Sequence, residues 1–377
     1  MNNHTPIHFP SSYQESRTYF REQLKKVKKI WPTAELDTHY ISETDDLSID
    51  WITADPIKKK EKLVLITTGL HGVEGFVGAA MLDLFLKEFI SLLDSEVTGV
   101  QFVHVINPWG MANIRRVNQN NVDLNRNFTD RQENFLEDFN PDYQKLNSTL
   151  NPDQPLKEFW IEDLVFIKNV IASLSREGIQ SLRGAVMLGQ PDYPDGLYYC
   201  GKEFQPETLV LKDMITRGFS IYDEILHVDM HTGYGPRDQM TLVNSPAEER
   251  KPDQLIKAFK YPLILASDPD QFYSMHGDMI DWSYRMKQSE FPYVKHYGTA
   301  FEFGTYGDGI LNEIKSLRTM IYENQAAHHG TLSERLLSRT REEILEMYFP
   351  FSNHWREKAI LDCRQAFSGV LTAEGYF

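Results

Sequence analysis

The hydrophobic pattern begins as amphipathic and changes to short, continuously apolar runs after residue 60. Apolar positions recur at helical spacing over Tyr13–Ile30, which predicts a helix. Two candidate strands follow at Glu35–Ser42 and Leu47–Ala54, separated by polar, turn-like residues. Lys62–Thr68 and Val100–Ile106 are short apolar runs of the kind that strands buried on both faces of a sheet show.

The order of elements after residue 60 predicts an α/β sheet with crossover helices. A helix is expected over Phe76–Ile90, between the two buried strands and after the tight loop Gly69–Gly75. Further strands are predicted at Gly184–Leu188, Glu224–Met230 and Gly298–Phe303, and helices near Glu207–Arg217 and at Asn312–Gln325, Thr331–Met347 and about His354–Phe367. In such sheets ligands bind at the carboxyl ends of the strands, so the loops there are where chemistry is expected.

No internal repeat or Gly/Ser-rich linker divides the chain. Thr129–Leu156 is rich in Asn, Asp, Pro and Glu without a clear period, which predicts a long surface excursion. We therefore predict one domain over residues 1–377, with a core at about 34–325, an N-terminal helix at 13–30 and C-terminal helices at 331–367. The predicted fold class is α/β, with a mixed, mostly parallel sheet flanked by helices.

Composition and charge exclude several classes of function. The 377 residues are 41% hydrophobic and 25% charged, an ordinary globular composition that excludes disorder and fibrous repeats. The net charge is 39 − 54 = −15, so neither nucleic acid nor a membrane surface is expected as the main partner. The N-terminal residues lack the pattern of a secretory signal, and we expect a cytoplasmic protein. Cys200 and Cys363 form no CxxC pair, so we expect two isolated thiols.

The loop after the first buried strand carries a candidate metal site. His71 and Glu74 lie three residues apart on a glycine-rich turn, where both can face one point, as two ligands of zinc must. An HxxE pair alone is weak, since His354 and Glu357 form another on a predicted helix. His231, however, ends a second predicted strand. Two histidines and one glutamate with a fourth position open to water are typical of a catalytic zinc site, so we expect one Zn²⁺ per chain.

Two more segments could complete such a site. The loop Arg116–Phe128, which follows a predicted strand, contains arginines, carboxamides and a carboxylate close together in sequence. A solvated loop would also be polar, but arginines near a metal could recognise a carboxylate or stabilise an oxyanion. Glu302 lies inside the apolar strand Gly298–Phe303. Because a buried glutamate is rare without a partner, Glu302 is predicted to be a general base or a metal-site contact.

These four segments, in this order, resemble the zinc metallocarboxypeptidase family typified by carboxypeptidase A, and more closely its uncharacterised bacterial relatives. Tyr273–Trp282 is similar to the tyrosine loop of that family, which leads into Ile-Asp-Trp, and Gln205–Thr208 resembles its helix-opening Pro-Glu-Thr. The resemblance extends over about residues 60–325. Single motifs are weak, but five in register are specific.

The resemblance implies a zinc-water mechanism. His71, Glu74 and His231 would bind zinc, and Glu302 would activate the bound water. Asp123 would accept a hydrogen bond from His71 and so fix the tautomer of that ligand.

The resemblance also assigns residues to the substrate. Arg116 would polarise the scissile carbonyl, Asn125 and Arg126 would hold a terminal carboxylate, and Tyr273 would close over it. Ile280, if it lines the specificity pocket, favours an apolar side chain over a basic one.

The predicted function is a zinc metallocarboxypeptidase that acts on small peptides with a free carboxylate. A zinc amidohydrolase of N-acyl amino acids, similar to succinylglutamate desuccinylase and aspartoacylase, is the alternative, since its substrates also end in a carboxylate. The Tyr273 loop and the Ile-Asp-Trp favour the peptidase. A catalytically silent binding protein is a third hypothesis, against which the presence of both Glu302 and Arg116 argues. The oligomeric state is left open.

Overall fold

In the computed structural model, which describes residues 6–129, 139–266 and 276–377, all of the strands belong to one sheet. The sheet has eight strands in the order β1-β2-β4-β3-β5-β8-β6-β7, and the central pairings β4–β3, β3–β5 and β5–β8 are parallel. The strands are β1 (Glu35–Ser42), β2 (Leu47–Ala54), β3 (Lys62–Thr68), β4 (Thr98–Val103), β5 (Glu224–Thr232), β6 (Met240–Asn244), β7 (Ile264–Ala266) and β8 (Lys295–Phe303). The predicted mixed, mostly parallel sheet is confirmed.

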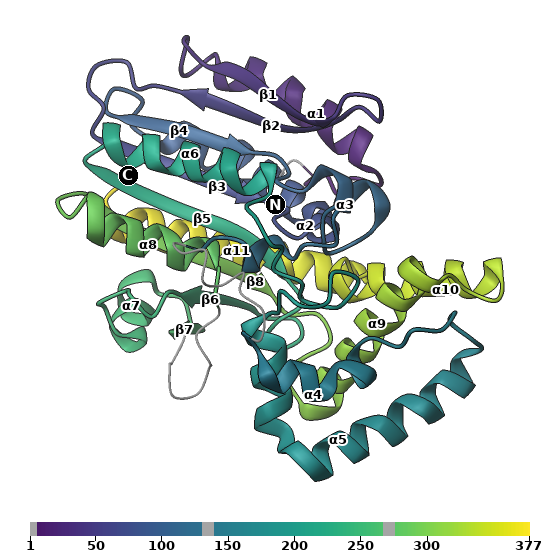
Figure 1. Cartoon of the computed structure of the whole chain (residues 1–377). Helices are drawn as coiled ribbons and strands as arrows, with labels where there is room; N and C mark the ends of the chain where they lie inside the picture. Colours follow the sequence, from purple (N-terminus) through teal and green to yellow (C-terminus); the bar gives the residue numbers. More distant parts are fainter. Residues whose placement is uncertain (1–5, 130–138, 267–275) are drawn as a thin grey trace.

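Helices cover both faces of this sheet (Figure 1). They are α1 (Tyr13–Val27), α2 (Gly75–Glu88), α3 (Pro108–Asn113), α4 (Pro141–Leu150), α5 (Phe159–Leu188), α6 (Pro206–Ile221), α7 (Pro252–Phe259), α8 (Met279–Glu290), α9 (Ile310–His329), α10 (Glu334–Tyr348) and α11 (Asn353–Ala373). No helix among the described residues is long and apolar enough to cross a membrane.

Strand β3 shows why the central strands are continuously apolar. Successive side chains of a strand point to opposite faces of the sheet. Val64 and Ile66 belong to the apolar cluster that α2 and α11 complete, whereas Leu63 and Leu65 belong to the cluster completed by α6 and α8. Both faces are therefore covered, and the carboxyl ends of β3, β5 and β8 meet at one edge.

A third apolar cluster lies beside the sheet, where α4 and α5 pack with α9 and α10 (Figure 1). We call these four helices the side lobe. Its core is built from aromatic and aliphatic side chains such as Tyr143, Phe159, Phe166 and Tyr322. Of these helices, α5 lies at the outer edge of the molecule (Figure 1).

Two predictions from the sequence are wrong in this lobe. Gly184–Leu188 is not a strand but the last turn and a half of α5, because a five-residue apolar run fits a buried helix as well as a buried strand. The predicted excursion Thr129–Leu156 contains α4, which buries Tyr143, Leu146 and Leu150 at helical spacing. Residues 130–138 of that segment lie outside the described residues.

Candidate metal centre

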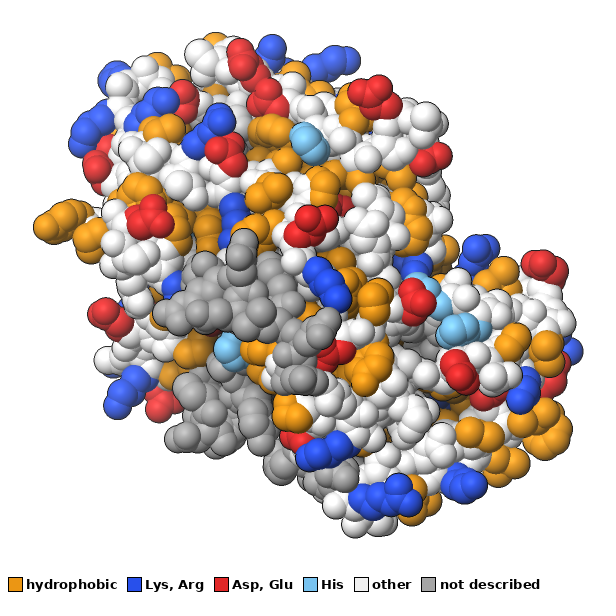
Figure 2. Space-filling model, viewed as in Figure 1, with side chains coloured by type: hydrophobic (Ala, Val, Ile, Leu, Met, Phe, Trp, Pro, Cys, Tyr) orange, Lys and Arg blue, Asp and Glu red, His pale blue; other side chains and the backbone are white. Residues whose placement is uncertain are grey.

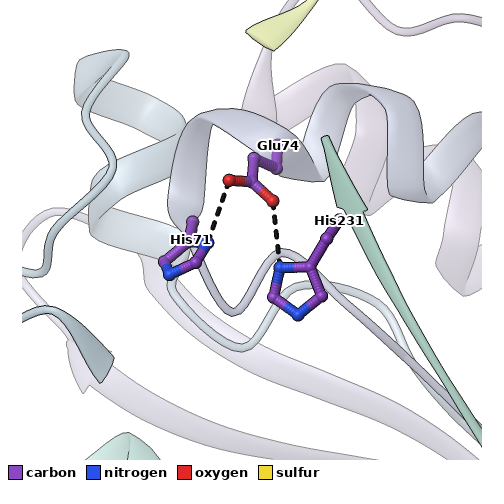
Figure 3. A group of neighbouring side chains, drawn as sticks. All are labelled: His71, Glu74 and His231. Carbon is purple, nitrogen blue, oxygen red and sulfur yellow. Dashed lines mark hydrogen bonds and ion pairs between the residues drawn. The ribbon is translucent and has the colours of Figure 1, made fainter. Parts of the chain in front are cut away.

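Three side chains from two strand ends converge at the carboxyl edge of the sheet (Figure 3). After β3 the chain turns at Gly69, whose φ of +63° lies in the left-handed region that glycine adopts easily. His71 follows and precedes a short 3₁₀ helix, Gly72–Glu74, which places Glu74 beside it. His231 is the next-to-last residue of β5. The predicted convergence of His71, Glu74 and His231 is found.

The Glu74 carboxylate lies between the two imidazoles. Its Oε1 is 2.9 Å from His71 Nδ1, and its Oε2 is 3.1 Å from His231 Nδ1. All three side chains are buried, and one ligand atom from each lies within 4.8 Å of the other two. Two imidazoles and one carboxylate at this spacing are a donor set that zinc favours.

A second carboxylate contacts the far nitrogen of each histidine. His71 Nε2 is 3.1 Å from Asp123 Oδ1, as predicted, and His231 Nε2 is 2.6 Å from Asp229 Oδ2. Asp229 is fixed in turn by Thr67, whose hydroxyl donates to Oδ1 over 2.7 Å. Such outer carboxylates hold Nε2 protonated and leave Nδ1 free to bind a metal.

Asp229 was not predicted, although the sequence contains a sign of it. It precedes His231 by two residues on one strand, and side chains two apart point to the same face.

The charges of the site agree with a bound cation. Burial alone would raise the pKa of Glu74, but His71 and His231 outweigh it and hold the pKa well below the usual range. Burial would likewise lower the pKa of His231, but Asp229 and Glu74 raise it well above its ordinary value. Without a metal, Asp229 and Glu74 thus hold a proton on the His231 imidazole. A divalent ion could replace that proton as the balancing positive charge.

Arg116 borders the same group. Its guanidinium bonds Asp123 Oδ2, with Nε 3.1 Å away, and reaches Glu74 Oε1 and the Tyr348 hydroxyl at 3.5 Å each. Its side chain keeps 19% of its exposure. A guanidinium that is mostly buried but still partly exposed to solvent can contact the carbonyl oxygen of a substrate. That is the role that the sequence resemblance implies for Arg116. Tyr348 was not predicted, since it follows Arg116 by 232 positions.

Glu302 stands beside His231 in the sheet. The two residues are direct neighbours in the parallel register of β5 and β8. Glu302 Oε2 is buried and has no hydrogen-bond partner among the described residues. Burial raises the pKa of Glu302 to about 7. A carboxyl group with such a pKa can take up and return a proton near neutral pH.

A cavity opens next to His231 and Glu302. It is lined by Asn125 and Ile280, two residues that were predicted to contact the substrate, and also by Asp278. The carboxamide of Asn125 bonds the start of α8, donating to Asp278 Oδ2 over 2.9 Å and accepting from the Met279 amide over 3.1 Å. Ile280 is therefore at the pocket, but it shares the wall with an acidic side chain.

Arg126 is buried, and no ion pair of its guanidinium is found within the described ranges, although Asp123 lies near enough to feel its charge. It is 4% exposed, its Nη1 donates to the Asn125 carbonyl over 3.0 Å, and its Nε has no partner among the described residues. Its guanidinium lies 5.9 Å from the ring centre of Tyr198. Tyr273, the remaining residue predicted to bind substrate, lies outside the described residues.

The chain belongs to a protein family. A family model described as "Protein of unknown function (DUF2817)" matches residues 9–362, which is nearly the whole chain. No curated protein matches the sequence.

Several solved structures have a partly similar chain course. Bovine thrombin-activatable fibrinolysis inhibitor, solved with tick carboxypeptidase inhibitor, is 14% identical with a TM-score of 0.46, covering 89% of this chain and 98% of its own. Carboxypeptidase A from Helicoverpa armigera is 14% identical with a TM-score of 0.43, covering 85% and 73%. A Shewanella amazonensis protein assigned to the succinylglutamate desuccinylase/aspartoacylase family is 18% identical with a TM-score of 0.39, covering 78% and 72%.

Proposed function

We propose that this protein is a zinc-dependent hydrolase that cleaves an amide bond next to a free carboxylate, and that it acts as a carboxypeptidase on small peptides. The observation that carries the proposal is the placement of Glu302. Glu302 pairs with His231 in the register of β5 and β8 and lines the cavity, and its Oε2 is buried without a hydrogen-bond partner among the described residues. A protein that only binds a ligand gains nothing from a buried carboxyl group in this position.

Zinc bound by His71, Glu74 and His231 would supply a water of lowered pKa and polarise the substrate carbonyl. Glu302 would take the proton from the attacking water and pass it to the leaving amine. Arg116, beside Glu74 and Asp123, would stabilise the oxygen that becomes negative during attack. Asp123 and Asp229 would keep the two imidazoles oriented.

Arg126 supports the requirement for a free carboxylate. The guanidinium of Arg126 is buried near Asp123, and its Nε has no hydrogen-bond partner among the described residues, so an added anion could pair with it. A terminal carboxylate of the substrate has the planar, bidentate geometry that matches a guanidinium. Both Arg116 and Arg126 lie close enough to Tyr198 to act on its pKa, so the two cations border one region.

The test begins with the metal content of protein purified without chelator. We expect about one zinc per chain, and hydrolysis that chelation stops and zinc restores. Three substrate panels then separate the hypotheses: dipeptides with a free carboxylate, the same dipeptides as carboxamides, and N-acyl amino acids. Cleavage of the first panel alone supports the carboxypeptidase, and cleavage of the third alone supports the amidohydrolase. No bound metal and no rescue by zinc would refute both.

The Arg126→Met variant tests how the carboxylate is held. Loss of a buried pairing partner costs about 2–5 kcal/mol, so kcat/KM on free dipeptides should fall by at least about 30-fold while zinc content stays the same. Arg183→Met, which removes a guanidinium paired with Glu313 on the surface, is the control and should leave kcat/KM unchanged. Equal kcat/KM for Arg126→Met and the parent would show that Arg126 does not bind the substrate.

A further inference from the structure

The outward face of α5 carries a stripe of exposed apolar side chains. Trp160, Leu164, Ile167 and Ile171 are 66%, 64%, 52% and 60% exposed. Helix α5 lies at the lower right of Figure 1, and hydrophobic side chains also gather at the lower right of the space-filling view (Figure 2). The opposite face of α5 packs into the core of the side lobe, where Phe159, Phe166 and Val170 are buried. A helix that is apolar on both faces is typically covered on both.

The spacing of the stripe is that of a helix seam. The four residues follow one another at intervals of four, three and four positions, which keeps them on one side of the helix. The same alternation of three and four places the core positions of paired helices along their contact line. Singly exposed apolar residues need no explanation, but a continuous seam does.

We propose that this stripe is the interface of a homodimer, in which α5 packs antiparallel against α5 of a second copy. The intervals four, three and four read the same in both directions, so the stripe is symmetric about its midpoint between Val165 and Phe166. A twofold axis through that midpoint would place Trp160 against Ile171 of the partner subunit and Leu164 against Ile167 of the partner subunit. Such self-complementarity is what a twofold dimer interface requires.

The charges beside the stripe favour the antiparallel arrangement. Asp163 and Lys168 lie at equal distances from the midpoint, so the twofold axis would bring each acid next to the partner's base. Asp163 uses Oδ1 for Arg318 and Tyr322, while its Oδ2 has no partner among the described residues. Lys168 is exposed and forms no ion pair among them. Parallel packing would instead oppose acid to acid and base to base, which is unfavourable.

Two charged residues beyond the ends of the stripe add to this pattern. Glu158 is exposed at the N-terminal end of the stripe, and Arg176 is exposed beyond its C-terminal end. The antiparallel pair would bring these opposite charges to the same end. The net charge of −15 argues against an anionic membrane as the occupant of this face.

The first test is the molar mass of the full chain in solution, measured by light scattering over a range of concentrations. We expect twice 43.8 kDa for the parent and 43.8 kDa for the double variant Leu164→Glu/Ile167→Glu. Leu361→Glu, which changes a leucine that is 57% exposed on α11, is the matched control and should remain dimeric. Circular dichroism and thermal unfolding verify that each variant is folded.

The second test fixes the orientation by cysteine cross-linking. Cys200 and Cys363 are buried and should not react. A mixture of the Leu164→Cys and Ile167→Cys proteins should form a disulfide-linked pair faster than either protein alone, because the antiparallel seam opposes these two positions. Faster linking of like with like would overturn the antiparallel arrangement.

Two results of the mass measurement would overturn the dimer itself. One is a parent that is monomeric at every concentration, and the other is a dimer that survives both glutamate substitutions. Binding of a monomeric parent to vesicles that contain anionic lipid, lost in the double variant, would assign the stripe to a membrane surface instead. These outcomes are independent of metal content and hydrolysis, so they do not depend on the proposed function.

Discussion

At the scale of single residues, Glu302 and Glu207 form an informative pair. Burial raises the pKa of each to about 7. Glu207 is held by Asn118, whose Nδ2 lies 3.3 Å from both carboxylate oxygens. Glu302 Oε2 has no such donor among the described residues, and Glu302 pairs in the sheet with His231, a candidate metal ligand. The two glutamates therefore share a raised pKa but differ in their surroundings. Glu207 is hydrogen-bonded within the protein, whereas Glu302 lies beside the candidate metal site with one oxygen unbonded among the described residues.

We expect Glu302→Gln to bind zinc with unchanged stoichiometry and to lower kcat by about 10²- to 10⁴-fold, because the amide cannot accept the proton of the attacking water. The measurement is kcat on the best dipeptide substrate, with zinc determined in the same sample. Glu207→Gln, the same substitution at a buried glutamate outside the candidate metal site, should keep kcat. Equal kcat for Glu302→Gln and the parent would remove Glu302 as the base.

At the scale of elements, the loop that carries His71 and Glu74 depends on close backbone packing. The Gly72 amide donates to the Arg116 carbonyl over 3.0 Å, and the Val73 amide donates to the Arg115 carbonyl over 2.9 Å. A Cβ at Gly72 would lie 2.3 Å from the backbone of Gly110. The loop that carries His71 and Glu74 can approach the segment from Gly110 to Arg116 this closely only because residue 72 has no side chain.

Gly72→Ala should therefore damage both stability and the metal site. Since the clash is with backbone, we expect a loss of about 1–3 kcal/mol in the free energy of unfolding and a weaker affinity for zinc. Urea unfolding and zinc titration measure the two effects. Gly309→Ala is the control, because a Cβ there would meet only Asn312 Nδ2 at 3.7 Å, an ordinary contact. A Gly72→Ala protein as stable as the parent would contradict the packing argument.

The elements also show what could be predicted from the sequence. The bounds of β1, β2 and β3 agree with the prediction, because their pattern and turn residues are local properties. Most of α5 was not predicted, and its end was taken for a strand, since its second apolar face hides the helical period. The short strands β6 and β7 were also not predicted; three to five residues leave too little pattern.

The candidate site was predictable to the extent that strand ends determine it. His71, Glu74, His231 and Glu302 follow or end buried parallel strands, and parallel strands bring their carboxyl ends to one edge. Tyr348 could not be found in this way. It reaches Arg116 from the end of α10, and that contact depends on how the side lobe packs against the sheet.

At the scale of the whole molecule, helices α9 and α10 of the side lobe contact the two arginines that border the candidate site. Arg115 donates to Glu323 over 2.6 Å and to Asn324 over 3.1 Å, both on α9. The next residue, Arg116, contacts Tyr348 at the end of α10. Arg115 and Arg116 thus lie between the candidate metal site and two helices of the side lobe. A dimer through α5 would stabilise the same lobe on its outer side.

The stability of the whole molecule should also depend on pH through Glu207. Its pKa is about 7 in the folded protein, above the ordinary value of 4.5 that applies to the unfolded chain. The folded state therefore binds this proton more tightly. The stabilising contribution is fully present below pH 4.5 and is lost as the pH rises through about 7, because a charged, buried carboxylate must then be carried by the folded state.

Glu207→Gln removes this titration while it keeps the shape of the side chain. From the size of the pKa shift, we expect the variant to gain up to about 3 kcal/mol relative to the parent between acidic pH and pH 8. Urea unfolding of both proteins at several pH values, with zinc held saturating, gives this difference as a function of pH. Other titrating groups act on both proteins equally and cancel in the comparison. A difference that does not change with pH would mean that Glu207 has the same pKa in the folded and unfolded states, and its burial would then have to be relieved by the bond from Asn118.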